Sequence, residues 1–314
     1  MSRQGELATA YTAARARLVR VAYAVLGEHA EAEDVVSDVW LRLTEADARE
    51  PILHVDGWAT VAVARRALDV LRSARVRRES YVGPWLPEPV LGSAGRPADS
   101  RTAPVDPVDR VTLDDSVSFA LLVVLETLSP AERTAWVLHD LFGMPFPEVA
   151  DAVGRTPSAV RQLAARARRH ITAAAPRTAV DVGEHSAVVA AFLRAASLGD
   201  LPGLLAVLDP DVTATSDGGG QVRAARRPVH GADKVARFVL GLATSIGADQ
   251  RIEVLSVNGA PGFALLDHDR PIVVVSLTVH QGRVERLDLV LAPDKLPDQL
   301  PDDATRGEEQ RRAR

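Results

Sequence analysis

Apolar residues recur at intervals of three and four through most of the first 80 positions, and few glycines or prolines interrupt them. This period is typical of amphipathic helices that bury one face. Two stripes stand out, and they comprise Val35, Val39 and Leu43, with Val36 and Trp40 beside them, then Val61, Ala64, Leu68 and Leu71. The pattern predicts an all-α domain over residues 5–81.

Glycine and proline interrupt this pattern over residues 82–112, where the chain begins YVGPWLPEPVLGSAGRP. Proline removes a backbone donor and cannot continue a helix, so this segment is expected to be an extended linker. Helical patterning resumes over residues 113–175 and ends at AAAPRTAVDVG. The sequence therefore predicts a second all-α domain beyond the linker.

The apolar pattern changes again from residue 184 onward. Helices are expected at 184–198 and near 201–208, and after them come segments that alternate with period two between glycine-, asparagine- and aspartate-containing turns. Those segments are residues 222–231, 251–267, 270–282 and 283–293. They predict a helix-led α+β domain over residues 184–292 with a curved antiparallel sheet. Residues 293–314 are expected to be a tail, disordered beyond its PDKL segment.

Composition excludes several classes of site. The chain has no cysteine, so it has no disulfide framework, no thiolate metal site and no cysteine nucleophile. No stretch is apolar enough for a signal peptide or a membrane span. We expect a soluble cytoplasmic protein with no membrane partner, no metal and no cofactor.

The charge distribution is more informative than the net charge of −5. Residues 28–50 carry eight acidic residues and two arginines, whereas arginines dominate residues 58–81 and 148–170. Lys234 and Lys295 are the only lysines, so nearly every positive charge is a guanidinium. Arginine suits bidentate contact with phosphate and guanine, although the same usage also fits a GC-rich genome.

The segment FPEVADAVGRTPSAVRQLAARARRH, residues 146–170, has the spacing of a helix-turn-helix. Gly154 supplies the turn, and Thr156 with Pro157 can begin the second helix. The residues expected to face inward are Val149, Ala150, Val153, Val160 and Leu163. Those left outward include Ser158, Arg161, Gln162 and Arg166, which suit base edges and phosphates. The alternative is an ordinary αα-hairpin with a solvated basic face.

An acidic helix precedes a basic one in the first domain. Asp34, Asp38 and Arg42 follow at four-residue steps on one face, a pattern that a solvated surface helix would also have. Arginines crowd one face of the next helix, the pattern of a phosphate-binding surface. The residues on that face are Arg65, Arg66, Asp69, Arg72 and Arg75.

In this order, AEDVVSDVWLRL, the Trp-led basic helix, the linker and LSPAERTAWVLHDLFGMPFPEVADAVGRTPSAVRQLAARAR resemble the extracytoplasmic-function sigma factors over residues 5–175. The resemblance implies that region two binds core RNA polymerase and melts the −10 promoter element, while region four reads the −35 element. The implied polymerase contacts are Asp34, Asp38, Trp40 and Leu41. The implied −10 contacts are Arg65, Arg66, Asp69, Arg72 and Arg75, and the implied −35 contacts are Ser158, Arg161, Gln162 and Arg166.

Three further fragments resemble a subgroup of these sigma factors that carries a SnoaL-like C-terminal extension. They are WLPEP in the linker, DGGGQ at residues 217–221 where the subgroup has a final lysine, and APDKL at residues 292–296. A proline-stiffened peptide loses little entropy when it docks, so we expect the linker to bind the C-terminal domain. The residues expected at this docking site are Trp85, Leu86, Pro87, Glu88, Pro89, Asp217, Gly218, Gly219, Gly220, Gln221, Asp294 and Lys295.

The sequence predicts an alternative sigma factor whose own C-terminal domain modulates its activity. Two alternatives stay open: a one-component regulator that senses a small ligand in the C-terminal domain, and a SnoaL-like isomerase or cyclase fused to a helix-turn-helix. An isomerase would need an acid–base pair, for which the candidates are Asp217, His230, His268 and Asp269. Fold alone does not imply such an activity, and none of these residues has a spacing that specifies it.

Overall fold

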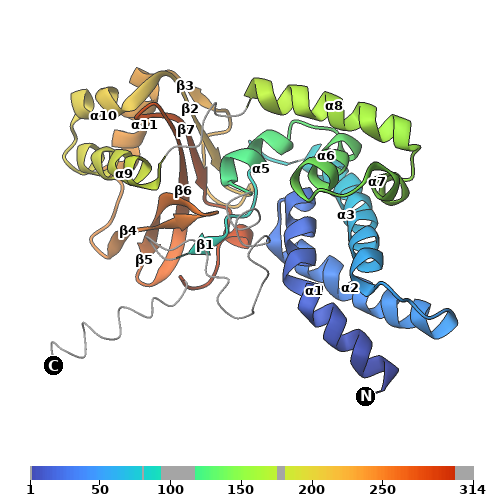
Figure 1. Cartoon of the computed structure of the whole chain (residues 1–314). Helices are drawn as coiled ribbons and strands as arrows, with labels where there is room; N and C mark the ends of the chain where they lie inside the picture. Colours follow the sequence, from blue (N-terminus) through green and yellow to red (C-terminus); the bar gives the residue numbers. More distant parts are fainter. Residues whose placement is uncertain (1, 80, 93–116, 175–180, 301–314) are drawn as a thin grey trace. The chain divides into compact units, whose positions relative to one another are not determined.

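The computed structural model describes residues 2–79, 81–92, 117–174 and 181–300. The expected linker residues 93–112 and the tail residues 301–314 lie outside this part of the chain. The chain divides into two compact units (Figure 1). One comprises Met1–Ser80 with Leu121–Ala175, and the other comprises Tyr81–Ala120 with Pro176–Arg314.

The first unit is helical and begins with a three-helix bundle of α1 (Arg3–Leu26), α2 (His29–Arg49) and α3 (Val55–Glu79). The hydroxyl of Ser2 caps α1, and Gly27 ends that helix in the left-handed conformation with φ of 79°. Val35, Val39 and Leu43 are buried, as the apolar period predicted. Ala64, Leu68 and Leu71 are buried too, whereas Val61 is half-buried.

The remaining helices of this unit are α5 (Phe119–Leu125), α6 (Pro130–Trp136), the π-helix η1 (Val137–Leu141), α7 (Phe146–Val153) and α8 (Pro157–Ala174). Ser129 and Glu132 form a capping box that begins α6. The predicted helix-turn-helix is α7 and α8, and Gly154 joins them with φ of 68°. A left-handed residue at this turn is why glycine occurs there.

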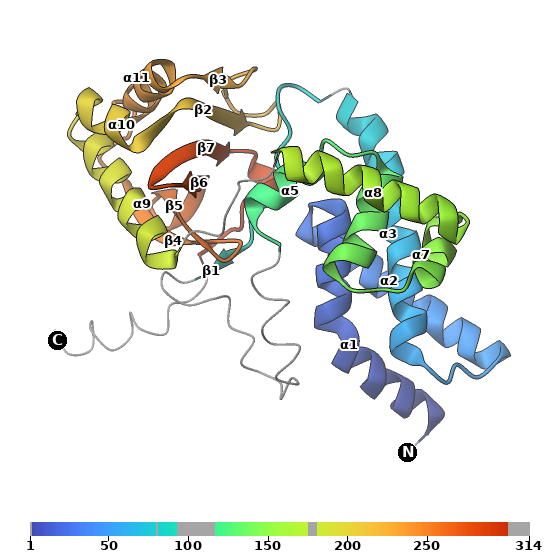
Figure 2. The same cartoon turned by 45° about the horizontal axis from the view of Figure 1, so that its top comes forward.

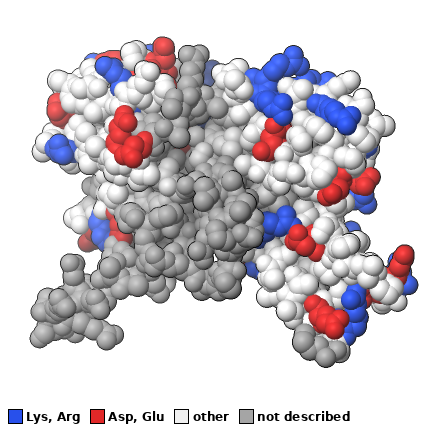
Figure 3. Space-filling model, viewed as in Figure 1, with Lys and Arg blue, Asp and Glu red and all other residues white. Residues whose placement is uncertain are grey.

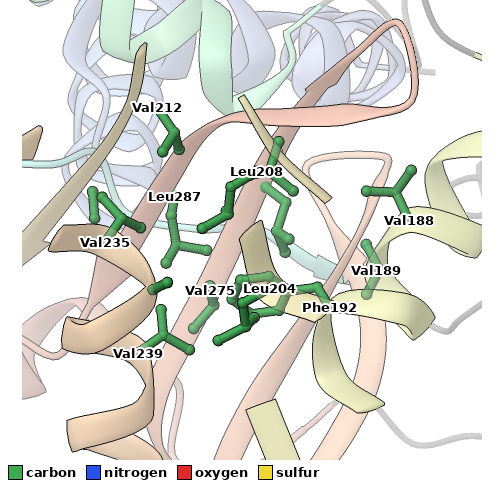
Figure 4. Packing of buried hydrophobic residues seen from close by; sticks show 14 of the residues in the cluster. Val188, Val189, Phe192, Leu204, Leu208, Val212, Val235, Val239, Val275 and Leu287 are labelled. Carbon is green, nitrogen blue, oxygen red and sulfur yellow. The ribbon is translucent and has the colours of Figure 1, made fainter. Parts of the chain in front are cut away.

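The second unit is an α+β domain whose helices cover one face of a curved sheet (Figure 2). The helices are α9 (Val182–Ser197), α10 (Leu201–Val207) and α11 (Ala232–Ala243). The main strands are β2 (Leu208–Asp217), β4 (Gln250–Val257), β5 (Ala260–Asp267), β6 (Arg270–His280) and β7 (Arg283–Val290). Figure 4 shows side chains such as Phe192 from α9, Val239 from α11 and Leu287 from β7 meeting in the core. This architecture confirms the predicted helix-led SnoaL-like domain.

The sheet has the strand order β1-β4-β5-β6-β7-β2-β3, where β1 is Leu91–Gly92 and β3 is Val229–His230. Strands β4 to β7 form an antiparallel meander, as expected. The β2–β7 pair is parallel, so the expectation of a purely antiparallel sheet was wrong at this edge. The last strand of the meander runs in the same direction as β2, which enters the sheet after the two helices.

Three further local expectations were incomplete. The expected strand over residues 222–231 is reduced to Val229–His230, because most of this arginine-rich segment is exposed and offers no buried face. The sequence analysis passed over β2, which contains Pro210; a register irregularity between Leu208 and Thr213 accommodates that proline. It also passed over α11, whose buried residues are Val235, Ala236 and Val239.

Candidate functional site

The predicted polymerase-binding residues share α2 but differ in exposure. Asp34 is exposed and Leu41 is 61% exposed, which is unusual for a large apolar side chain and marks a contact surface. Trp40 is half-buried with its ring 5.3 Å from that of Tyr11. Asp38 accepts a hydrogen bond from Arg66 of α3 at 3.0 Å. The outer edge of α2 therefore presents an acidic residue and an apolar one side by side.

The basic face of α3 is partly occupied by the helix-turn-helix half of the same unit. Arg65 donates a hydrogen bond to the carbonyl of Asp151 in α7 at 2.7 Å, and Arg75 donates one to the carbonyl of Leu128 at 2.9 Å. Arg72 lies 3.4 Å from Asp69 on its own helix. Two of the predicted −10 contacts are thus bound to protein carbonyls in this structure.

A cluster of ions also joins these halves. Arg78 of α3 binds Glu126 at 2.7 Å, and it binds Glu28 and the carbonyl of Leu26 at 3.1 Å each. Arg133 of α6 is 1% exposed, binds Glu126 as well, and donates to the carbonyl of Ala24 at 3.1 Å. Burial lowers the pKa of Arg133, and the neighbouring Glu126 carboxylate opposes that shift. Glu126 is therefore the counter-ion that two arginines share. We call Arg78, Glu126 and Arg133 the ion latch.

The second helix of the helix-turn-helix, α8, exposes every residue predicted to read DNA. The exposed residues are Ser158, Arg161, Gln162 and Arg166. Thr156 accepts a hydrogen bond from the amide of Ala159 at 3.3 Å and so caps the helix. Val160 is buried, whereas Leu163 is half-buried and the small Ala164 and Ala167 complete the contact. Basic side chains gather over α8 on the surface seen in Figure 3.

Two of these α8 arginines are oriented by neighbours within the unit. The guanidinium carbon of Arg161 lies 5.2 Å from the centre of the Phe146 ring, within the range of a cation–π interaction. Arg166 donates to Glu132 at 3.1 Å.

The linker motif binds the C-terminal domain through a buried ion pair. Asp217 at the end of β2 is fully buried, and its Oδ2 accepts from the amide of Leu86 at 2.9 Å and from Lys295 at 2.7 Å. Lys295, 5% exposed, donates in turn to the carbonyl of Leu86 at 2.6 Å. The hydroxyl of Tyr81 donates to Asp217 Oδ1 at 2.6 Å. Both backbone polar groups of Leu86 are thereby satisfied by one aspartate and one lysine.

The aromatic residues of the linker lie beside this pair rather than deep in a groove. The Lys295 ammonium is 4.1 Å from the centre of the Trp85 ring and 5.3 Å from that of Tyr81, so two aromatic faces stabilise its charge. Trp85 and Glu88 are half-buried, whereas Leu86, Pro87 and Pro89 are buried. Leu86 is thus the deepest side chain of the motif.

The glycines of DGGGQ shape a turn beside the pair. Gly219 and Gly220 are left-handed, and a side chain on Gly218 would lie 2.5 Å from the carbonyl oxygen of Val222. We expected the glycine amides to face the partner, but the amide of Gly219 binds Asp217 at 3.0 Å instead. A side chain on Gly219 would lie 3.5 Å from Asp294, and Gln221 is exposed. The glycines therefore let this turn approach the PDKL segment closely.

Comparison with known proteins identifies the helical parts. The family described as "Sigma-70 region 2" matches residues 10–77, and "Sigma-70, region 4" matches residues 118–171. The ECF RNA polymerase sigma factor SigJ of Mycobacterium tuberculosis is 40% identical over 295 residues, which cover 91% of each chain. The chain belongs to the extracytoplasmic-function (ECF) sigma factors.

Two more similarities extend over the whole sigma factor. The M. tuberculosis protein described as "Probable ECF RNA polymerase sigma factor SigI" is 36% identical, with 94% of this chain and 97% of that one covered. The crystal structure of M. tuberculosis SigJ aligns with a TM-score of 0.70 at 36% identity, covering 90% of this chain and 95% of that one. Family membership implies that the chain binds core RNA polymerase and promoter DNA and directs transcription initiation.

The alternative of an enzyme does not hold, since the chain is a sigma factor. The four residues proposed for acid–base chemistry are also not brought together. Asp217 is bound to the linker, His230 lies near Thr213 on the sheet edge, and His268 and Asp269 form an exposed hairpin turn. In the described part of the chain, no helix is both long and apolar enough to span a bilayer.

Sequence reasoning missed three parts of the site. Tyr81 joins the Asp217 pair, Leu91–Gly92 adds a strand to the sheet edge at β4, and Asn258 binds the linker backbone. Only Asn258 carried a signal, because Asn-Gly is typical of a tight hairpin turn. The ion latch was also missed, since its partners are far apart in sequence.

Proposed function

We propose that the C-terminal domain restrains this sigma factor by holding the linker between regions 2 and 4. The observation that carries the proposal is the buried Asp217–Lys295 pair, which binds both backbone polar groups of Leu86. A buried pair with satisfied hydrogen bonds fixes geometry more than it adds stability. It therefore sets where the linker starts, and with it how far region 4 can move from region 2.

In vitro transcription by core RNA polymerase tests this proposal with the Asp217→Ala variant. Release of the linker is expected to raise promoter-directed output while core binding stays as in the wild type. Output equal to that of the wild type would remove the proposed restraint.

We further propose a division of labour among the three domains. Residues 5–81 bind polymerase through Asp34, Asp38, Trp40 and Leu41 and bind the −10 element through the basic face of α3. Residues 113–175 bind the −35 element through α8, and residues 184–292 regulate. The exposure of Leu41 and of the outward residues of α8 supports these assignments.

Replacing Arg161 or Gln162 by alanine is expected to weaken recognition of the −35 element by about 1–3 kcal/mol, because each would lose contacts to base edges. The measurement is holoenzyme binding to promoter fragments by fluorescence anisotropy at fixed salt. Arg169→Ala is the matched control, since Arg169 is exposed on the same helix but outside the proposed set. Equal losses for all three variants would contradict the assignment.

A second candidate function, ligand binding by the C-terminal domain, is favoured by a cavity of about 300 Å³ between α9, α11 and the sheet. Ser245 and Gln250 are its only polar lining residues in the part of the chain that the structure describes, and none of the lining residues is titratable. Such a lining fits a neutral, mainly apolar small molecule with one hydrogen-bonding group.

Filling this cavity is expected to weaken binding of a neutral solvatochromic dye at least about tenfold, because a large side chain takes up the ligand volume. The test variant is Ala196→Phe, which adds a ring inside the lining. Ala190→Phe is the control, because Ala190 is exposed on the same helix. Absence of dye binding by the wild-type chain, or equal binding by both variants, would exclude this function.

A further inference from the structure

Asn258 binds both ends of the linker. Its Oδ1 accepts a hydrogen bond from the amide of Val90 at 3.0 Å, and its Nδ2 donates to the carbonyl of Val117 at 3.3 Å. Its own backbone amide donates to the carbonyl of Val90 at 2.8 Å. Val90 and Val117 flank residues 91–116, so one side chain closes that stretch of chain into a loop.

The local fold explains why asparagine occupies this position. Asn258 and Gly259 form the turn between β4 and β5, with φ of 50° and 80°, and asparagine tolerates this left-handed backbone. The turn projects the side chain at the sheet edge where β1 pairs with β4. An amide offers an acceptor and a donor at once, which is what the two linker ends require.

We propose that Asn258 is a positioning residue that keeps regions 2 and 4 from separating until the promoter is engaged. This inference rests on the proposed restraint of the linker and names a second point at which that restraint acts. While Asn258 holds Val90 and Val117, residues 91–116 add nothing to the reach between the two regions.

The distances involved require the loop to open. The −35 and −10 elements lie about 25 base pairs apart, which is roughly 85 Å at 3.4 Å per base pair. A compact unit of the size of the helical one spans only about 40 Å. Residues 91–116 could span at most roughly 90 Å when extended, so their release supplies the missing reach. Promoter binding and closure by Asn258 therefore oppose each other.

Two variants separate the bonds that Asn258 makes. Asn258→Gly removes the side chain and keeps the left-handed turn, whereas Asn258→Asp keeps the acceptor for Val90 and loses the donor to Val117. At subsaturating promoter, Asn258→Gly is expected to raise transcription about three- to thirtyfold, and Asn258→Asp to a value between the two. Gln281→Gly is the matched control, because Gln281 precedes Gly282 in the β6–β7 turn with φ of 48°.

A reversible crosslink tests the same step without relying on loss of a side chain. The chain has no cysteine, so Val90→Cys and Val117→Cys can be joined by a short cleavable thiol crosslinker. The crosslinked protein is expected to bind core RNA polymerase normally and to transcribe at less than one tenth of the uncrosslinked level. Cleavage of the crosslinker is expected to restore transcription.

The outcomes distinguish this inference from the proposal on which it rests. Unchanged transcription for Asn258→Gly and for the crosslinked protein, with a changed output for Asp217→Ala, would overturn the role of Asn258 alone. Wild-type output for all of them would overturn both. An effect at Asn258 without one at Asp217 would support the clamp and reject the ion pair as the restraint.

Discussion

Asp217→Ala is expected to destabilise the C-terminal domain by about 3–5 kcal/mol, because removal of one partner of a buried ion pair leaves the other charge uncompensated. Lys295 would remain 5% exposed, with the Leu86 carbonyl and two aromatic rings as its remaining contacts in the pair's surroundings. The measurement is the free energy of unfolding of the full chain by denaturant titration, read from the transition of the α+β domain.

Two further variants show whether the loss comes from the stranded charge. The double variant Asp217→Ala/Lys295→Met is expected to recover much of the lost stability, since no ammonium is then left buried. Asp233→Ala is the control, because its ion pair with Arg237 lies at an exposed surface. If the double variant were as unstable as the single one, packing rather than charge would explain the result.

The same replacement separates stability from function. Leu86 would lose the acceptor for its amide, so the linker would be bound less tightly even where the domain stays folded. Promoter output is therefore expected to rise in Asp217→Ala, and the double variant is expected to keep a raised output while regaining stability. Activity and stability would then move in different directions, which a merely structural role would not produce.

The DNA-binding face of α3 has a second occupant in this structure. Arg65 and Arg75 donate to carbonyls of the region 4 half, and a DNA phosphate would need the same guanidinium groups. Each such protein hydrogen bond is worth a modest net free energy, so promoter DNA can replace it. Region 4 therefore competes with the −10 element for region 2, which fits a closed arrangement of the free protein.

Much of the helical unit could be predicted because its determinants are local. The three- and four-residue period located the buried faces of α2 and α3, and Gly154 with Thr156 located the helix-turn-helix. What the period could not give is which exposed arginines have protein partners. Arg65 and Arg75 bind carbonyls more than 50 residues away, and such contacts leave no trace in a local pattern.

The α+β domain was harder to predict for similar reasons. Pro210 argued against a strand, yet the irregular register of β2 tolerates it. The sequence fragments indicated that Asp217, Lys295 and WLPEP belong together, but not that Leu86 is the deepest contact. Leu91–Gly92 joins the sheet through backbone hydrogen bonds, which make no demand on side-chain type. The role of Asn258 likewise depends on the chain returning to it at Val117.

Glu126→Gln is expected to open the helical unit. The change keeps the shape of the side chain and removes the charge that Arg78 and Arg133 share. Arg133 is 1% exposed, so an uncompensated guanidinium there costs about 3–5 kcal/mol unless regions 2 and 4 separate and expose it to water. Separation is the expected response, because each region keeps its own helices when the contact opens.

Fluorescence energy transfer within the cysteine-free chain measures this opening. Labels at Arg49→Cys and Arg169→Cys, two exposed positions in regions 2 and 4, are expected to move apart in Glu126→Gln while the helical circular dichroism is retained. Glu148→Gln is the control, because Glu148 is exposed on α7 and its replacement strands no buried charge. An unchanged label distance with retained helicity would show that the ion latch does not hold the two regions together. Because opening frees Arg65 and Arg75, the same variant is also expected to bind promoter DNA more tightly once core RNA polymerase is present.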